Sequence, residues 1–345
     1  MANPVPGVTR TALQTLPMID VSAFPSGPEA ERRRVAAALR RACIDIGFFY
    51  VTGHGIPEAE LDDVIRWGHR FFELPMAEKL KISRALVGGG QGYSKPGSAD
   101  GYAAGDKLPD FKERFIMSRE LVPGEPATGR FNAGESVWPE ESVLPGFAAF
   151  MKAHMARRMQ LARRLVRVFA LSLDLPEDYF DGMFRLSGGT MIINYYPSQG
   201  DRMLPPGQWN FSPHTDYGAF TLLLQDSLGG LEALNADGQW IDVPPIPGTF
   251  VVNLGDMFQR WTNDLYVSTL HRVTNSSGKA RISVPLFNYP HGDTVIECLP
   301  TCASPEQPPR HAPVVAEAYN RELADRAART GRPGVSAVTA ARLTT

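Results

Sequence analysis

The spacing of apolar positions predicts a helical first part of the chain. Residues 28–45 carry apolar side chains at helical spacing, and Pro57 can occupy the first turn of a second helix. A long amphipathic helix is predicted from about residue 142 to residue 172. The segments LPMIDVSAF (16–24) and GFFYVTGHG (47–55) are rich in strand-forming residues and predict short strands within this helical part.

After about residue 184 the pattern changes to short apolar runs separated by turns. Asp237-Gly238, between two such runs, is a hairpin signal. Six or more short strands of this kind predict an antiparallel sandwich or a jelly roll, and residues 312–330 predict a final helix. The runs are TMIINYYP, GAFTLLLQD, GGLEALNADGQWIDVPP, GTFVVNLGD, STLHRVTN and RISVPLFNYP.

Composition narrows the classes of protein. Lys and Arg number 35 against 37 Asp and Glu, so nothing in the charge balance favours binding to nucleic acid or to an anionic membrane. We expect no membrane span and no secretory signal, because no apolar run is long enough for either. Three cysteines, too few for a disulfide framework, predict inert thiols and a cytoplasmic location: Cys43, Cys298 and Cys302. No sequence feature indicates an oligomeric state.

Residues 87–107, VGGGQGYSKPGSADGYAAGDK, form a long stretch of glycine and polar residues. The Lys-Ser/Thr pair that completes a phosphate-binding P-loop is missing, so a nucleotide site is not favoured. A loop of this length within a compact domain is usually functional or disordered, and we interpret it as a lid over a pocket.

Three residues form a candidate metal site. His214 and Asp216 in FSPHTDYG stand two apart, so in an extended strand their side chains project to the same face. His271, in another predicted strand, can supply a third ligand, and His291 is the rival for that role. Two histidines and one carboxylate with further positions open are typical of non-haem Fe(II) oxygenases. The other histidines are interpreted as a turn residue (His54), as helix residues on or near the surface (His69, His154) and as an exposed residue (His311).

A second group of residues favours binding of an acid. In RISVPLF, Arg281 and Ser283 share one strand face and together suit a carboxylate, although an internal ion pair is an alternative partner for the arginine. In NYYP, Asn194 and Tyr196 also share a face and could bind the same ligand. The alternative for Tyr196 is a packed tyrosine with its hydroxyl satisfied.

The order of these motifs resembles the isopenicillin N synthase-like family of 2-oxoglutarate- and iron(II)-dependent dioxygenases. The resemblance runs from about residue 16 to residue 290 and is carried by GFFYVTGHGI, DFKERF, NYYP, HTDYG, LGDMFQRWTND, STLHRVTN and RISVPLF. It implies that Fe(II) is bound by His214, Asp216 and His271. It also implies that Arg281 and Ser283 bind the distal carboxylate of 2-oxoglutarate, with Asn194 and Tyr196 touching this cosubstrate near the metal.

The family further implies an α+β fold, a double-stranded β-helix (jelly roll) core flanked by helices. We expect a mixed α/β region over 1–125, a connecting helical region over 126–183, the catalytic core over 184–300 and a C-terminal helix and tail over 301–345, all in one compact unit. The implied reaction uses O2 to oxidise, most simply to hydroxylate, a C–H bond of a small molecule. 2-Oxoglutarate becomes succinate and CO2, and ascorbate is a candidate reductant.

Two alternatives remain open at the level of sequence. One is an iron oxidase of the same fold that uses no 2-oxoglutarate, and the other is a non-catalytic jelly-roll module that only binds a metal. Lys112 and Arg114 in DFKER could meet an anionic substrate, but a solvated run of charges is the favoured interpretation. The candidate substrate residues are Phe211, Tyr217, Phe287, Tyr93 and Lys95.

Overall fold

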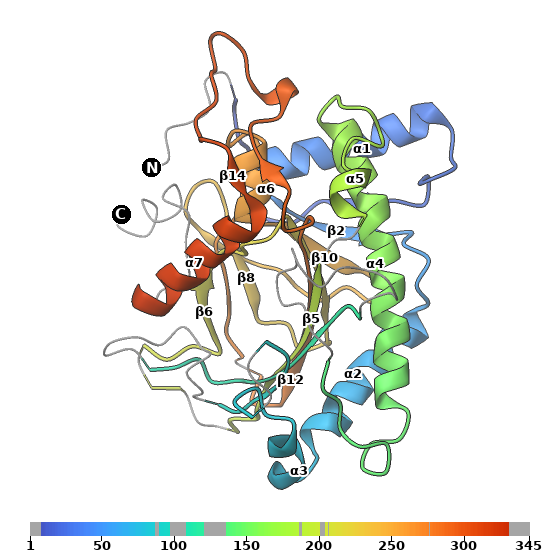
Figure 1. The fold of residues 1–345 in the computed structure, drawn as a ribbon, viewed down its shortest axis with the longest axis vertical. Helices are drawn as coiled ribbons and strands as arrows, with labels where there is room; N and C mark the ends of the chain where they lie inside the picture. Colours follow the sequence, from blue (N-terminus) through green and yellow to red (C-terminus); the bar gives the residue numbers. More distant parts are fainter. Residues whose placement is uncertain are drawn as a thin grey trace.

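Two facing β-sheets form the centre of the molecule, and helices pack outside them (Figure 1). The computed structural model describes residues 8–86, 90–96, 108–120, 136–185, 188–200, 204–205, 207–275 and 277–330. This arrangement is the jelly roll flanked by helices that the sequence predicts, so the predicted fold class is confirmed.

The larger sheet combines strands from both parts of the chain. Its first two strands are parallel, and all its other neighbouring strands are antiparallel. Four of its strands come from the first 120 residues, so the N-terminal part of the chain is continuous with the core. In spatial order the strands are β1 (Met18–Asp20), β2 (Phe48–Thr52), β10 (Phe250–Leu254), β7 (Phe220–Gln225), β12 (Arg281–Asn288), β5 (Gly189–Tyr196), β4 (Glu113–Ser118) and β3 (Gly92–Ser94).

The smaller sheet is antiparallel throughout. Asp237-Gly238 lies in the turn that joins its last two strands, and Gly238 has a φ of 75°, a left-handed conformation that glycine adopts without strain. The predicted hairpin is therefore confirmed. The order is β6 (Phe211–His214), β11 (His271–Val273), β8 (Leu231–Leu234) and β9 (Trp240–Asp242), and a separate pair is formed by β13 (Val295–Ile296) and β14 (Val314–Val315).

Helices α1, α2 and α4 cover the outer face of the larger sheet. The long α4 runs down one side of the molecule, with α1 packed against its C-terminal end and α2 against its N-terminal half (Figure 1). Within the described part of the chain, no helix is both long and apolar enough to cross a membrane. The helices are α1 (Glu29–Asp45), α2 (Glu58–Phe72), α3 (Met76–Lys81), α4 (Phe147–Ser172), α5 (Asp181–Phe184), α6 (Asp256–Trp261), the 3-10 helix η1 (Pro300–Cys302) and α7 (Ala316–Thr330).

Strand alternation decides which side chains face the helices and which face the space between the sheets. On β5, Met191 and Ile193 belong to the large apolar core beneath the helices. Tyr196 instead belongs to a second apolar cluster that joins the two sheets, and Asn194 faces the same way. The functional residues can therefore meet only on the inner side of the larger sheet.

One buried histidine corrects a sequence expectation. His154, expected on or near the surface, is completely buried on α4. Its Nδ1 lies 2.8 Å from a carboxylate oxygen of Glu60 on α2. Burial lowers the pKa of His154 well below its usual value, and the charges of Arg158 and Arg157 act in the same direction. The residue is a helix-to-helix contact and not part of the candidate metal site.

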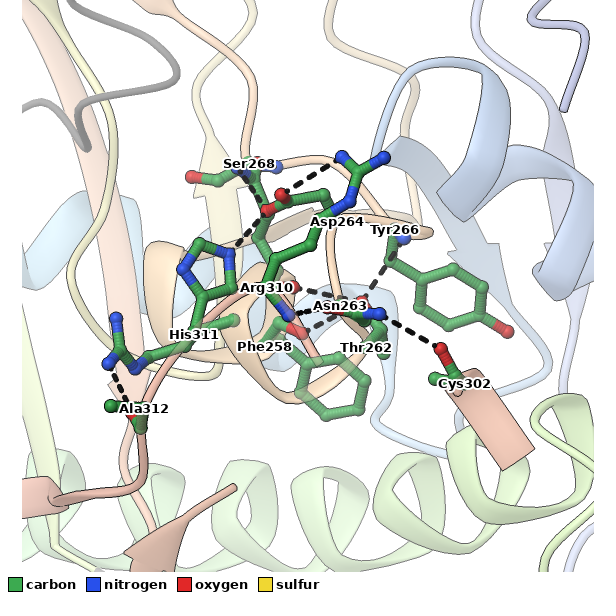
Figure 2. A network of polar contacts seen from close by, with 12 residues as sticks. Phe258, Thr262, Asn263, Asp264, Tyr266, Ser268, Cys302, Arg310, His311 and Ala312 are labelled. Atoms are coloured by element: carbon green, nitrogen blue, oxygen red, sulfur yellow. Dashed lines mark hydrogen bonds and ion pairs between the residues drawn. The ribbon is translucent and has the colours of Figure 1, made fainter. Parts of the chain in front are cut away.

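The segment before α7 is fastened to the loop after α6 by a group that we call the C-terminal clasp: Asn263, Asp264, Arg310 and His311 (Figure 2). His311 Nε2 lies 3.0 Å from Asp264 Oδ1, and the Arg310 backbone N–H donates to Asn263 Oδ1 at 2.8 Å. His311 is half-buried in this contact, so the expectation of an exposed residue is wrong. Burial raises the pKa of Asp264, but His311 and Arg310 outweigh it and hold that pKa below its usual value.

The clasp predicts a pH-dependent loss of stability for Asp264→Asn. Asp264 has a φ of 67°, which asparagine also tolerates, so the substitution removes the charge without adding backbone strain. We expect the free energy of unfolding at pH 7 to fall by about 1 kcal/mol. Because the pKa of Asp264 is lowered on folding, its contribution is complete above the unfolded pKa and is lost as the pH falls through the folded one. Urea unfolding between pH 7 and pH 3 measures this difference.

Asp62→Asn on the exposed side of α2 is the matched control, and it should leave the free energy of unfolding almost unchanged. If the free energies of unfolding of the wild type and of Asp264→Asn differ by the same amount at every pH, the carboxylate charge does not hold the clasp.

Candidate metal centre and cosubstrate site

Strand pairing brings the two predicted histidine ligands together. His214 ends β6 and His271 begins β11, and the antiparallel register sets these two residues directly opposite each other. Cross-strand neighbours of this kind have their Cβ atoms about 5 Å apart, and here the two imidazole centroids are 4.1 Å apart. Asp216 follows in the connection to β7 and not within an extended strand, but its side chain still reaches the same point.

The three side chains can act as ligands of one metal ion. One donor atom from each of His214, Asp216 and His271 lies within 4.8 Å of the others. Each histidine Nε2 is 3.8 Å from Asp216 Oδ1. Separations of this size suit three ligands that each lie about 2 Å from a shared ion. His291 is not part of the cluster, so the structure favours His271 as the third ligand.

Hydrogen bonds orient both imidazoles toward this point. The Nδ1 atom of His214 lies 2.8 Å from the Ser212 carbonyl, and that of His271 lies 3.0 Å from the Thr269 carbonyl. With Nδ1–H donating to a carbonyl, each Nε2 is left as a lone-pair donor for a metal. Burial lowers the pKa of His214 well below its usual value, with His271 and Lys112 acting in the same direction, so the imidazole is in the neutral form that binds metals.

The two oxygens of Asp216 have different partners. Oδ2 accepts hydrogen bonds from Thr221 Oγ1 and from Asn253 Nδ2, the latter at 2.6 Å, and Oδ1 faces the histidines. A carboxylate held in this way offers one oxygen to a metal, which leaves room for other ligands. Thr221 and Asn253 were missed at the level of sequence, although Asn253 is the one polar residue in the apolar run FVVNL.

A close approach of two backbone segments fixes the position of Asp216. A Cβ on Gly255 would lie 2.2 Å from the Gly218 carbonyl oxygen, so only glycine fits there. This contact lets the Asp256 N–H donate to the Asp216 carbonyl at 2.7 Å. The glycines of HTDYG and NLGD therefore position the metal-binding carboxylate.

The acid-binding residues pair across two strands of the larger sheet. The register of β5 and β12 sets Tyr196 opposite Arg281 and Asn194 opposite Ser283. Ser283 Oγ lies 3.3 Å from the Tyr196 hydroxyl and 3.4 Å from Asn194 Nδ2. The four residues predicted from RISVPLF and NYYP thus form one polar group on the inner face of this sheet.

Arg281 has a free nitrogen although it is buried. Its Nε donates to the Gly229 carbonyl and its Nη2 to Gln225 Oε1 at 3.0 Å. Nη1 has no hydrogen-bond partner, and the side chain is 1% exposed. Within the described part of the chain no Asp or Glu forms an ion pair with Arg281, so an internal ion pair does not account for it. A carboxylate from a ligand fits this nitrogen, because a buried unpaired donor is costly.

One cavity between the sheets is lined by both groups of residues. The metal ligands come from the smaller sheet and its connections, and the acid-binding residues come from the larger sheet. Of the predicted substrate residues, Phe211 and Phe287 line this cavity. The lining residues are Asn194, Tyr196, Phe211, His214, Asp216, Thr221, Leu223, Leu231, Asn253, His271, Val273, Arg281, Ser283, Pro285 and Phe287.

The other predicted substrate residues lie elsewhere. Tyr93 is completely buried on the helix side of the sheet, because its partner in the register is Phe115, and its hydroxyl donates to Glu113. Tyr217 packs against the same helix-side core. Lys95 is exposed and does not line the cavity. Most of the predicted lid, residues 87–89 and 97–107, lies outside the described residues.

A jelly roll with two histidines, one carboxylate and a buried arginine defines the class of non-haem iron oxygenases. Two family profiles agree with this class. One, described as the 2OG-Fe(II) oxygenase superfamily, matches residues 187–290. The other, described as the N-terminal region of non-haem dioxygenases in morphine synthesis, matches residues 16–141.

Named relatives extend along nearly the whole chain. A 2-oxoglutarate-Fe(II) type oxidoreductase of Emericella nidulans is 36% identical over 335 residues, which cover 90% of this chain and 94% of that protein. Homoarginine-6-hydroxylase of Glycine max is 35% identical, covering 84% and 90%. The crystal structure of a full-length Neurospora crassa protein in complex with alpha-KG (2-oxoglutarate) has a TM-score of 0.81 and 30% identity, covering 94% of this chain and 100% of that one. A further structure of the same Neurospora protein also contains thymine.

The chain belongs to the family of 2-oxoglutarate- and iron(II)-dependent oxygenases. It is an enzyme, a dioxygenase whose cofactors are Fe(II) and 2-oxoglutarate, and these predictions are confirmed. Family membership therefore favours catalysis with a keto acid over both alternatives left open by the sequence.

The protein residues and the bound cofactors have different roles in this site. When bound, Fe(II) would activate O2, the oxidant, and 2-oxoglutarate would supply two of the electrons that reduce it as it becomes succinate and CO2. His214, Asp216 and His271 would hold the metal ion, and Arg281 with Ser283 would bind a carboxylate of the cosubstrate. The apolar part of the cavity wall excludes water around these groups, which strengthens their electrostatic interactions.

Asn253→Ala is predicted to weaken metal binding without abolishing it. The substitution removes one of two hydrogen bonds that hold Asp216 Oδ2, and loss of such a supporting contact typically reduces metal affinity about 10- to 100-fold. His214→Ala, which removes a ligand, should abolish Fe(II) binding. Anaerobic calorimetric titration with Fe(II) measures both. Asn235→Ala in the β8–β9 hairpin is the control for loss of a buried asparagine, and wild-type affinity in Asn253→Ala would contradict the assigned role.

Arg281→Lys is predicted to raise the KM for 2-oxoglutarate about tenfold or more. Lysine keeps the positive charge but cannot donate to Gln225, Gly229 and a ligand carboxylate together, and a hydrogen bond to a charged group contributes about 1.5–3 kcal/mol. Succinate formation at varied 2-oxoglutarate gives the KM. Arg272→Lys, whose guanidinium pairs with Glu232, is the matched control. An unchanged KM in Arg281→Lys would mean that the keto acid binds elsewhere.

Proposed function

We propose that this enzyme hydroxylates a C–H bond of a small organic molecule that binds beside the metal, while 2-oxoglutarate is converted to succinate and CO2. The observation that carries this proposal is the shared cavity, in which the metal ligands and the Arg281 group face each other between the two sheets. One substrate molecule placed in this cavity lies next to the three metal ligands.

The cavity wall supports a substrate with an apolar or planar part. Phe211 and Phe287 contribute aromatic rings, and Leu223 and Pro285 contribute aliphatic surface. Apolar walls with a few placed polar groups are typical of pockets for small molecules. The relatives also support a small-molecule substrate, because the Neurospora protein has been crystallised with thymine and another relative is named homoarginine-6-hydroxylase.

Hydroxylation is favoured over desaturation or ring closure because a relative that matches most of this chain is named a hydroxylase. We further propose a cytoplasmic location, which the three free cysteine thiols support, since disulfides are rare in that compartment.

The proposed reaction predicts two measurable products. Incubation with Fe(II), ascorbate and labelled 2-oxoglutarate should yield succinate slowly without a prime substrate, and faster when a small-molecule library contains one. Under 18O2, one labelled oxygen should appear in the product and one in succinate. Mass spectrometry of both measures the result. A product that loses two hydrogens and gains no oxygen would replace hydroxylation by desaturation, and no succinate under any condition would remove the proposal.

A further inference from the structure

The motif DFKERF contributes no side chain to the assigned site, and its Lys112 has surroundings that the site does not explain. The sequence suggests a solvated run of charges here, but the structure corrects this, because Lys112 is 4% exposed and lies just before β4. Glu113, the next residue, is also buried and pairs with Lys79 at 2.8 Å. Two adjacent buried charges at the start of β4 indicate that this segment places one charged side chain on each side of the sheet.

Strand register shows that Lys112 lies on the cavity side. Glu113 pairs with Tyr195 and Arg114 with Asn194 in the β4–β5 ladder. Asn194 lines the cavity, so Arg114 lies on that face, and Lys112, two residues earlier, does so too. Glu113 points to the opposite face, where it contacts Lys79 and the hydroxyl of Tyr93.

The ammonium group of Lys112 lies close to the metal site. Its Nζ is 2.7 Å from the ring centroid of Phe211, and that ring stacks on the imidazole of His214 with 3.9 Å between the centroids. Phe211 lines the cavity. A single aromatic ring therefore separates the charge of Lys112 from the imidazole of His214. Lys112 lies behind this lining ring, so a substrate group that passes the edge of Phe211 would meet the ammonium.

The hydrogen-bonding capacity of the Lys112 ammonium is only partly used. Asp110 Oδ2 lies 3.3 Å from Nζ, within range of an ion pair, but neither atom has a hydrogen-bond partner. The other oxygen of Asp110 accepts from the Ser212 N–H, which holds that carboxylate in place. An ammonium has three hydrogens, so beyond its contact with Asp110 it can still donate to an oxygen of a ligand, which would lower the cost of burying the charge.

The electrostatic surroundings also favour an anion. Burial lowers the pKa of Lys112 to about 7, and the positive charge of Arg114 acts in the same direction, whereas Asp110 opposes both. A bound carboxylate would favour the charged amine, because opposite charges at short range stabilise each other in a buried site. Lys112 carries one positive charge and already contacts Asp110. It therefore suits a ligand group with a single negative charge better than a group with two.

We propose that Lys112, with Arg114 beside it, binds a carboxylate of the prime substrate, so that this enzyme acts on small organic acids. The inference rests on the proposed function of the same cavity. It concerns a second carboxylate, distinct from that of 2-oxoglutarate, which the Arg281 group binds on β12. Lys112 is thus a specificity-determining residue of the substrate pocket.

The wild-type enzyme provides the first test. A panel of aromatic and aliphatic monocarboxylic acids is compared with the matching primary amides, beginning with phenylacetate and phenylacetamide. Binding is titrated anaerobically with Fe(II) and 2-oxoglutarate present. We expect at least one acid to bind about tenfold or more tightly than its amide, the gain typical of a charged hydrogen bond. A panel in which no acid binds more tightly than its amide overturns the proposal.

Variants assign the preference to Lys112. In Lys112→Met the ratio of acid to amide affinity should fall toward one, and in Lys112→Arg most of the preference should return. Lys81→Met, at an exposed lysine on α3 paired with Glu78, is the matched control and should keep the wild-type ratio. Thermal unfolding of each variant establishes that it folds.

Other outcomes are equally informative. If Lys112→Met weakens the acid and the amide alike, Lys112 only holds Phe211 in place and the proposal is wrong. If the variant instead raises the KM for 2-oxoglutarate and leaves the acid preference unchanged, the amine serves the cosubstrate and the proposal is again wrong. Failure of the proposed function would be seen separately, as absence of succinate in the wild type, because the anaerobic titration requires no turnover.

Discussion

The site depends on two antiparallel pairings, one in each sheet. Pairing of β6 with β11 places His214 opposite His271, and pairing of β5 with β12 places Tyr196 opposite Arg281. A shift of either register by one residue would turn the side chains of the shifted strand to the other face of its sheet. The metal group and the acid-binding group then face each other because the sheets pack through a shared apolar cluster. The catalytic geometry is therefore a property of the backbone hydrogen-bond ladders.

Asp216 is the exception, since it lies beyond the end of its strand and needs other support. Thr221 and Asn253 hold one carboxylate oxygen, and the Asp256 N–H holds the backbone carbonyl. Thr221 and Asn253 are direct partners in the β7–β10 ladder, and Asp256 follows β10 after Gly255, which packs closely against the Gly218 backbone. The carboxylate is therefore held indirectly, by two side chains that the β7–β10 ladder sets side by side and by a close backbone contact.

The ordered series of motifs was sufficient to predict three residues that the structure brings within 4.8 Å of one another, although Asp216 lies outside the extended strand that the sequence suggested. It was not sufficient for Tyr93 and Lys112. Tyr93 lies on the edge strand β3 and Lys112 just before β4. The side that each faces is set by the register of β3, β4 and β5, which come from separate parts of the chain. Asn253 was missed for a related reason, since its partner Asp216 is 37 residues away in sequence and the contact depends on the pairing of β10 with β7.

The donor atoms of the candidate metal site also bear on which metal ion the protein binds. Among the described residues the cluster offers three donors, two nitrogens and one oxygen, with no thiolate and no fourth side chain to enforce a geometry. Affinities of such sites follow the general order of the divalent metals, in which cobalt, nickel, copper and zinc all exceed ferrous iron. Loading with iron is then decided by which ions the cell makes available. Competing ions would occupy the same three ligands and leave the folded protein intact but inactive.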